Sequence, residues 1–348
     1  MRRLGLVNAL PFLQLLLVIE RRNGSPGGAT HFDLSPRRST LFQSPTRAEA
    51  RPSLCGGSRA RALAIALLGM PMLLGGCSRT ISESTILHGH SAPREELRED
   101  LLRHNVELGS ASGELLRGWH LENPRATRMV VFFANNTTTL LENAESLWKL
   151  ADALRADVVA FDYRGYGFSS GTPSLRAMLD DAPRVSAFAR VIAERRGLPI
   201  AVVGQSLGTF PAGRAAAPAW VEELILIAPA ASVNDLVQAV GHNLPWYRHA
   251  VVGASLEQVG INPSADIAAT HADLLLIHDA EASFLPLASS ERLLQASKSA
   301  RRAICQAPGG YGEMAPTNPG VRRCMLDFLR QATRQAPPSE PPHRTARR

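Results

Sequence analysis

The chain has 348 residues, 45% of them apolar and 20% charged, which excludes collagen-like, coiled-coil and wholly disordered proteins and leaves room for one α/β unit with appendages. Its formal charge of +7 belongs to the leader, because residues 1–77 hold ten arginines and three acidic residues, whereas residues 78–348 hold 28 basic and 28 acidic residues. The neutral body lacks the basic surface that phosphate binding needs, so we expect no nucleic-acid partner.

The leader carries a signal-like segment. An apolar run at residues 62–74 follows two arginines and is shorter than the ~20 residues of a membrane-spanning helix, which is typical of a secretory signal. The sequence L-G-G-C that ends at Cys77 resembles the bacterial lipoprotein box, whose cysteine receives a diacylglyceryl group. We therefore predict that residues 58–77 are a lipoprotein signal peptide and that Cys77 anchors the protein to the membrane, facing the periplasm of a bacterial cell envelope. The alternative is a buried apolar helix, against which Pro71 argues.

The flanking segments look unstructured. We expect residues 1–57 to be disordered, because much of this stretch is rich in arginine, serine and proline without apolar periodicity. Our hypothesis is that translation begins nearer Arg59. Residues 78–110 are polar with mixed charge, and we predict a tether there, with a short helix around 93–105. The proline-rich residues 333–348 are expected to be a disordered tail.

From residue 111 to 332, short apolar runs alternate with longer amphipathic ones, the pattern of strands and helices in turn. Because the two kinds alternate, we predict an α/β domain with a mostly parallel, doubly wound sheet that is covered by helices on both faces. Less periodic residues at 237–269 predict a small cap. The expected strands are 129–133, 157–161, 200–203, 223–228, 273–278 and 303–306, and the expected helices are 140–155, 174–196, 209–216, 289–297 and 321–331.

Two stretches match the pattern G-x-S-x-G, at residues 204–208 and 167–171. The first follows a predicted strand and enters an alanine-rich helix, which is the strand, sharp turn and helix that a nucleophilic serine needs. The second runs into Pro173, so no helix begins directly after its serine. We therefore predict that Ser206 is the nucleophile and that the second match is a loop.

Three further segments carry a family resemblance. Residues 161–174 contain the stretch D-Y-R-G-Y-G followed by S-G-T-P-S, and residues 228–235 and 275–286 follow the next two strand patterns. Together with the motif around Ser206 they resemble the α/β-hydrolase superfamily over residues 113–332, in particular its single-domain lipase, thioesterase and depalmitoylase-like branch. The resemblance implies the fold predicted above and hydrolysis of an ester or thioester.

In this superfamily two backbone N–H groups hold the tetrahedral oxyanion, one directly after the nucleophile and one in the loop after an early strand. The resemblance places these donors at Leu207 and Asn136. The family has histidine and glycine ahead of that asparagine, whereas this chain has Ala134 and Asn135. The alternative is that the two asparagines only form a turn.

The remaining triad positions depart from the family. Its acid position falls on Ala282, with Glu281 as the nearest substitute, although an exposed loop carboxylate is the alternative for Glu281. Its histidine position falls on Tyr311 or Gly312 in the loop after the last strand. A serine needs a base within hydrogen-bond reach, and the downstream chain offers only His343, in the tail.

Three other histidines lie further upstream. His242 and His249 belong to the predicted cap and His278 to the end of a predicted strand, so each could approach Ser206 from another direction. For each of them a structural or surface role is the alternative.

The cysteines and histidines give no metal pattern. His88 and His90 have no companion at zinc spacing, and we expect neither a metal nor a cofactor. Cys305 and Cys324, a predicted strand residue and a residue of the following helix, form either a disulfide in an oxidising compartment or two buried thiols.

Two functions follow. The first is a lipid-anchored serine hydrolase that acts on a carboxylic ester or thioester through an acyl-Ser206 intermediate. The second is a catalytically impaired relative that binds a small acyl ligand or a partner, because Ala282 and Tyr311 or Gly312 occupy the usual acid and histidine positions.

Overall fold

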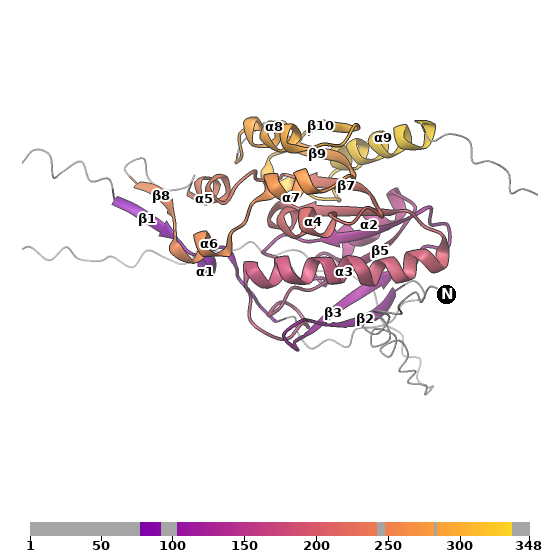
Figure 1. The fold of residues 1–348 in the computed structure, drawn as a ribbon, viewed down its shortest axis with the longest axis horizontal. Coiled ribbons are helices and arrows are strands. Elements are labelled where there is room, and N and C mark those ends of the chain that lie inside the picture. The colour runs from indigo at the N-terminus through magenta and orange to yellow at the C-terminus, as the bar shows by residue number, and fades with distance from the viewer. Residues whose placement is uncertain (1–76, 92–102, 242–247, 282–283, 336–348) are drawn as a thin grey trace, which may run out of the picture. The chain divides into compact units, whose positions relative to one another are not determined.

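The computed structural model describes residues 77–91, 103–241, 248–281 and 284–335 (Figure 1). The predicted signal peptide upstream of Cys77 lies outside these residues, as do most of the predicted tail and the positions of Ala282, His242 and His343. Among the described helices, none has both the length and the apolarity to cross a bilayer.

An eight-stranded sheet forms the centre of the fold. Its strand order is β10-β9-β7-β6-β4-β5-β3-β2, parallel from β10 to β5 and antiparallel for β3 and β2. The parallel strands inside the sheet, from β9 to β5, are almost entirely buried on both faces and read as mainly apolar runs, which is why the sequence predicts them. The strands are β2 (Arg103–Gly109), β3 (Leu115–Leu121), β4 (Arg128–Phe133), β5 (Ala156–Phe161), β6 (Ile200–Gln205), β7 (Val221–Ile227), β9 (Asp273–Asp279) and β10 (Arg302–Ala307).

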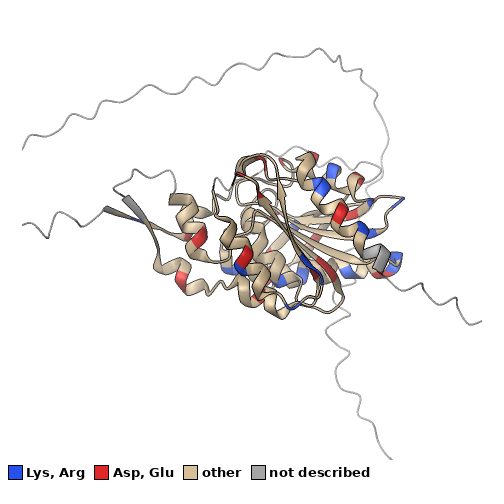
Figure 2. Cartoon of the chain, turned by 90° about the horizontal axis from the view of Figure 1, so that it is seen from above, with Lys and Arg blue, Asp and Glu red and all other residues tan. Residues whose placement is uncertain are grey.

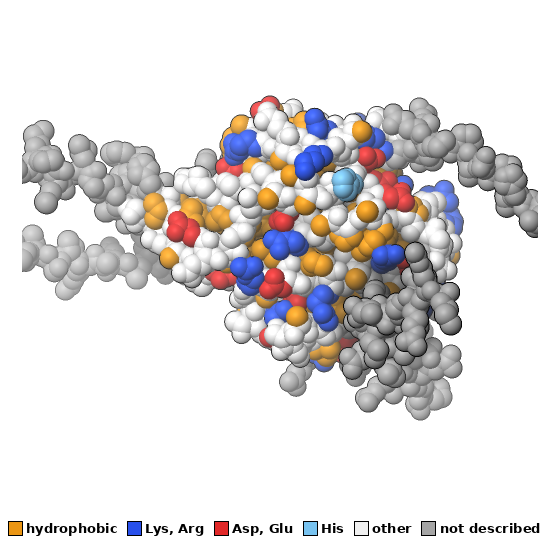
Figure 3. Space-filling view, viewed as in Figure 1, with side chains coloured by type: hydrophobic (Ala, Val, Ile, Leu, Met, Phe, Trp, Pro, Cys, Tyr) orange, Lys and Arg blue, Asp and Glu red, His pale blue; other side chains and the backbone are white. Residues whose placement is uncertain are grey.

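Helices cover both faces of the sheet, as predicted. One apolar core joins the sheet to α2 (Ala144–Ala153) and α9 (Pro319–Gln335). The other joins it to α3 (Leu175–Arg196), α4 (Thr209–Ala215) and α8 (Leu287–Ala296). Acidic and basic residues are mixed along the elements of this body (Figure 2). On the face drawn in Figure 3, apolar side chains lie among them singly or in small groups.

The predicted tether is wrong for the part of it that the structure describes. Residues 103–109 form β2, the edge strand, and residues 77–91 are packed against the fold. In this N-terminal segment, β1 (Cys77–Ile81) and α1 (Glu83–Ile86) bury Ile81 and Ile86 at 1% and 2% exposure. Few apolar residues stand among many polar ones here, so the composition hides a buried face.

The cap is built from two distant parts of the chain. Residues 233–260 contribute α5 (Val233–Gly241), β8 (Arg248–Val252) and α6 (Ala254–Val259), and β8 pairs in parallel with β1 of the N-terminal segment. Figure 1 shows these elements gathered at one end of the body. The last part of the predicted cap, α7 (Pro263–Ala269), belongs to the body instead, because it packs on α4 and α8.

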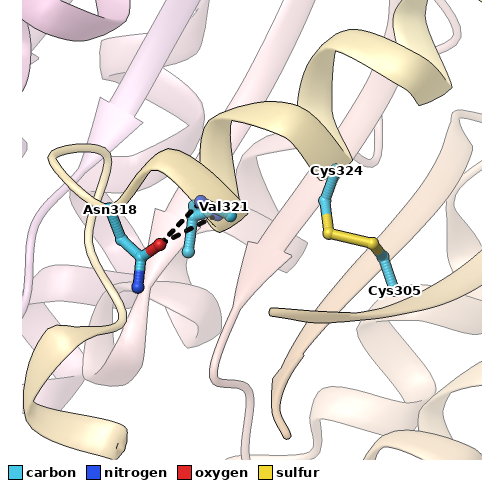
Figure 4. The surroundings of a disulfide bond; sticks show 5 residues. Cys305, Asn318, Val321 and Cys324 are labelled. Atoms are coloured by element: carbon cyan, nitrogen blue, oxygen red, sulfur yellow. Dashed lines mark hydrogen bonds between the residues drawn. A yellow bond between two sulfur atoms is a disulfide. The ribbon is translucent and has the colours of Figure 1, made fainter. Parts of the chain in front are cut away.

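A disulfide joins β10 to α9. The Cα atoms of Cys305 and Cys324 are 5.9 Å apart and their sulfur atoms are bonded (Figure 4). Six residues before Cys324, the side chain of Asn318 accepts hydrogen bonds from the N–H groups of Gly320 and Val321, at 2.7 and 3.4 Å, and so caps the start of α9. The disulfide fixes this helix to the edge strand of the sheet.

Replacing both cysteines by serine is expected to lower the free energy of unfolding by about 3 kcal/mol, since the bond closes a loop of 19 residues and its loss restores chain entropy to the unfolded state. Urea unfolding of the wild type and of C305S/C324S measures the difference. A reductant should destabilise the wild type by a similar amount and leave the variant unchanged. Equal stability of the oxidised wild type and the variant would contradict the prediction.

Candidate active site

Ser206 lies on a sharp turn at the end of β6. The residue has a φ of +52°, a left-handed conformation that costs an L-residue roughly 1–2 kcal/mol. A 3-10 turn over Ser206–Gly208 leads from the strand into α4, and the hydroxyl of Thr209 donates a hydrogen bond of 2.7 Å to the Ser206 carbonyl. This is the strand, turn and helix that the sequence predicts for a nucleophilic serine.

The two motif glycines allow this turn to form. A Cβ on Gly204 would lie 2.6 Å from the Cβ of Ala212 on α4. A Cβ on Gly208 would approach the carbonyl oxygens of Phe133 and Ala134 more closely than the 3.0 Å that side chains respect. The turn therefore packs directly against the end of β4.

The second predicted oxyanion donor lies in the loop that leaves β4. Strands β4 and β6 are neighbours with Phe133 opposite Gly204, so the loop and the serine turn share one edge of the sheet. The side chain of Asn135 accepts hydrogen bonds from the backbone N–H of Thr137, at 2.9 Å, and from two threonine hydroxyls, which makes the turn that we considered as an alternative. The serine turn meets the start of this loop, where Gly208 lies against the carbonyl oxygens of Phe133 and Ala134.

Backbone strain concentrates at this edge. Among the described residues, the non-glycine positions with positive φ are Arg155, Ser206 and Ala228. Ala228, with a φ of +50°, directly follows β7, whose last residue pairs with Gln205. Ser206 and Ala228 thus end adjacent strands in the same strained conformation, and such strain typically marks functional sites.

The structure favours a different acid from the one preferred in the sequence analysis. Glu281 is exposed, as expected for the alternative of a loop carboxylate. Asp279 is the last residue of β9, is 4% exposed, and accepts a hydrogen bond of 2.8 Å from the Glu281 N–H. Asp279 and Glu281 both lie beside Ala282 in the chain, and Asp279 is the buried one of the two.

His278 is engaged with α8. Its ring is 1% exposed, its Nδ1 lies 3.0 Å from Ser290 Oγ, and its Nε2 is buried without a hydrogen-bond partner. Burial lowers the pKa of His278, and the nearby Asp279 offsets this in part. Ser290 on α8 thus holds one ring nitrogen of His278, which favours a structural role for this residue.

The loop after β10 reaches the serine turn without a histidine. The side chain of Gln205 donates a hydrogen bond of 3.0 Å to the Met314 carbonyl, which ties the nucleophile strand to this loop. A 3-10 turn spans Tyr311–Glu313, so Gly312 is exposed where the family has its histidine. His249 lies on β8 and its side chain is outside the described part of the structure, like all of His242.

Stability is expected to fall as the pH drops below about 6.5, because the lowered pKa of His278 makes the unfolded chain bind a proton before the folded one does. The stabilising contribution of neutral His278 is fully present above the pKa that His278 has in the unfolded chain. It is lost as the pH falls toward the lower pKa that His278 has in the folded protein. Urea unfolding between about pH 7.5 and 5 should show a shallower loss for His278→Gln than for wild type. The exposed His271→Gln is the control, and equal slopes for all three proteins would refute the assignment.

Comparisons with known proteins agree with the fold described above. Residues 138–302 match the family model described as alpha/beta hydrolase fold. The uncharacterized protein Rv2307c of Mycobacterium tuberculosis is 26% identical over 231 residues, which cover 65% of this chain and 78% of that protein. Lysophosphatidylserine lipase ABHD12 of Macaca fascicularis is 34% identical over 93 residues, 26% of this chain and 23% of the lipase.

A solved structure shows the same fold. The esterase Pf2001 of Pyrococcus furiosus superposes with a TM-score of 0.52 at 17% identity, over 66% of this chain and 91% of the esterase. The strand order, the serine turn after β6 and the matched family model lead to one conclusion. The chain has the alpha/beta hydrolase fold.

Proposed function

We propose that the protein is a serine hydrolase that cleaves carboxylic esters or thioesters through an acyl-Ser206 intermediate. The observation that carries the proposal is the left-handed conformation of Ser206 at the end of β6, beside the loop that holds the second oxyanion donor. A strained serine between two required glycines has no evident packing purpose, whereas a nucleophile must be held in this way.

The chemistry follows from the arrangement. A base takes the proton of the Ser206 hydroxyl as its Oγ attacks the acyl carbon, and the negative charge on the carbonyl oxygen is stabilised by the N–H groups of Leu207 and Asn136. The bond to the leaving alcohol or thiol then breaks as the base passes that proton to the leaving group. Water, deprotonated by the same base, attacks the acyl carbon, and Ser206 takes the proton back as the carboxylic acid is released. Asp279, a buried carboxylate at the end of β9 and three residues before the family's acid position at Ala282, is the acid in this proposal. The proposal requires a base from outside the loop after β10, and the cap provides the candidates His242 and His249.

Fluorophosphonate labelling tests the proposal. The probe should label the wild type and fail to label Ser206→Ala, because it reacts with activated serines. Ser169→Ala is the matched control, since it removes the serine of the other G-x-S-x-G stretch and should keep the label. A folded wild type that stays unlabelled would overturn the proposal.

A second function is favoured by Gly312. With Gly312 at the family's histidine position, the second candidate is a protein that has kept the pocket but binds a small acyl ligand or partner without hydrolysing it. A Cβ on Gly312 would meet nothing within 4 Å, so a histidine fits there. Ala282→Asp combined with Gly312→His should then create Ser206-dependent turnover of a short-chain p-nitrophenyl ester that the wild type lacks. Turnover by the wild type itself would exclude this second candidate.

We also propose that Cys77 carries a lipid and holds the protein in a bacterial cell envelope, facing the periplasm. The L-G-G-C sequence supports this, and so does the Cys305–Cys324 disulfide, because such bonds persist in oxidising compartments. Incorporation of an alkyne fatty acid into the wild type but not into Cys77→Ser would support the anchor, and equal incorporation would exclude it.

For the substrate of the proposed hydrolase, the name of the partly similar lysophosphatidylserine lipase favours an ester-bearing lipid.

A further inference from the structure

Two tyrosines of the D-Y-R-G-Y-G stretch hold the loop that carries the second oxyanion donor. The hydroxyl of Tyr163 donates a hydrogen bond of 2.8 Å to the carbonyl of Ala134. The hydroxyl of Tyr166 donates one of 3.1 Å to the carbonyl of Asn136. Their ring centroids are 6.0 Å apart, with the planes at 80°, so the two side chains form one packed unit beneath the loop.

These two hydrogen bonds hold the two peptide groups that flank the peptide between Asn135 and Asn136. The Ala134 carbonyl belongs to the peptide before it. The Asn136 carbonyl belongs to the peptide after it, whose N–H is that of Thr137 and is itself held by the Asn135 side chain at 2.9 Å. The peptide between them carries the Asn136 N–H. Because each planar peptide group includes its two flanking Cα atoms, holding both neighbours fixes the Cα atoms of Asn135 and Asn136, so the middle group can turn only about the line between them.

The hydroxyl groups keep the protons that they donate. Tyr166 is 1% exposed, and burial raises the pKa of both tyrosines. The Tyr166 hydroxyl also accepts a hydrogen bond of 3.1 Å from the backbone N–H of His88, so both its donor and its acceptor capacity are used. The N-terminal segment touches the loop a second time, where the Asn136 side chain donates to the Ile86 carbonyl.

We infer that Tyr163 and Tyr166 are positioning residues for the oxyanion site, which hold the Asn136 N–H toward the serine turn. The inference rests on the proposed function for its catalytic consequence, while the restraint on the loop stands on the contacts alone. An oxyanion donor acts only if it is already oriented when charge develops, because reorienting it during the reaction costs free energy. The tyrosines therefore act through the loop and not on the substrate.

The kinetic test uses Tyr163→Phe and Tyr166→Phe in the full-length protein. Each is expected to lower kcat for a p-nitrophenyl ester by about ten-fold or more with little change in KM, because the oxyanion contact strengthens in the transition state. Thr270→Val is the matched control, since it removes a buried hydroxyl that donates to the Ala216 carbonyl at 2.6 Å far from the loop in sequence. A raised KM with unchanged kcat would overturn the inference.

Hydrogen exchange separates this inference from the proposed function. Peptides covering residues 133–138 should exchange faster in both tyrosine variants than in the wild type and in Thr270→Val, whether or not the protein is a hydrolase. If the exchange rates increase while the wild type shows no Ser206-dependent labelling, the proposed function fails and the restraint on the loop stands. If the exchange rates do not change, the inference fails even for an active enzyme.

Discussion

Replacing Arg164 by methionine is expected to lower the free energy of unfolding by about 3–5 kcal/mol, because it leaves a buried carboxylate without its partner. The Nε and Nη2 of Arg164 donate two hydrogen bonds of 2.7 Å to the carboxylate of Asp181 on α3. Asp181 is 5% exposed and Arg164 is 9% exposed. The arginine also donates to Ser112 and Glu114, so its loss frees the loop before β3 as well.

Two further variants test whether the loss of stability comes from the unpaired buried charge. The double variant Arg164→Met with Asp181→Leu removes both charges and should be more stable than Arg164→Met alone, since no unpaired charge remains buried. Arg190→Met removes an exposed arginine that pairs with Glu194 one turn along α3, which is expected to cost less than about 1 kcal/mol. Urea unfolding measures all four proteins. Similar losses for Arg164→Met and Arg190→Met would show that burial of the first pair has no energetic weight.

Gly208→Ala is expected to cost about 3 kcal/mol of unfolding free energy and to abolish fluorophosphonate labelling of Ser206. Overpacking typically costs 1–3 kcal/mol, and the added methyl group would overlap two backbone carbonyl oxygens of the loop after β4, which cannot move aside as a flexible side chain does. The turn and the oxyanion loop must therefore separate. The added methyl group would thus move both Ser206 and the loop that carries Asn136, the proposed oxyanion donor.

The control is Gly213→Ala on the following helix. A Cβ there would lie 3.6 Å from the Cβ of Asp266, an ordinary contact, and alanine in a helix is favoured over glycine by up to about 1 kcal/mol. This variant should be as stable as the wild type or more so, with normal labelling. Equal stability and equal labelling for the two glycine variants would contradict the close packing at Gly208.

The sequence predicts the centre of the fold well because its strands are buried on both faces. Strands such as β5 and β6 are buried throughout and mainly apolar, and turns of known chemistry separate them from the helices. The edge strand β2 is different. Most of its side chains are at least partly exposed, so its polar residues look the same as those of a tether.

Whether a part of the site can be predicted from the sequence depends on how close together its residues lie in the chain. Ser206 and its glycines are close in sequence and form a local motif, so the pattern reveals them. The contact of Tyr166 with Asn136 and the pairing of β1 with β8 join residues far apart in the chain. Such contacts follow from tertiary packing and leave no periodicity in either segment, which is why the two-part cap was not predicted.

The start of β1 at Cys77 has a mechanical consequence for an anchored protein. If that cysteine carries the proposed lipid, the acyl chains are attached to the first residue of a paired strand, and no slack separates the bilayer from the fold. An anchor of this kind would hold the folded domain close to the lipid headgroups, with the cap toward the membrane. The protein would then meet its substrates by lateral diffusion in the plane of the membrane.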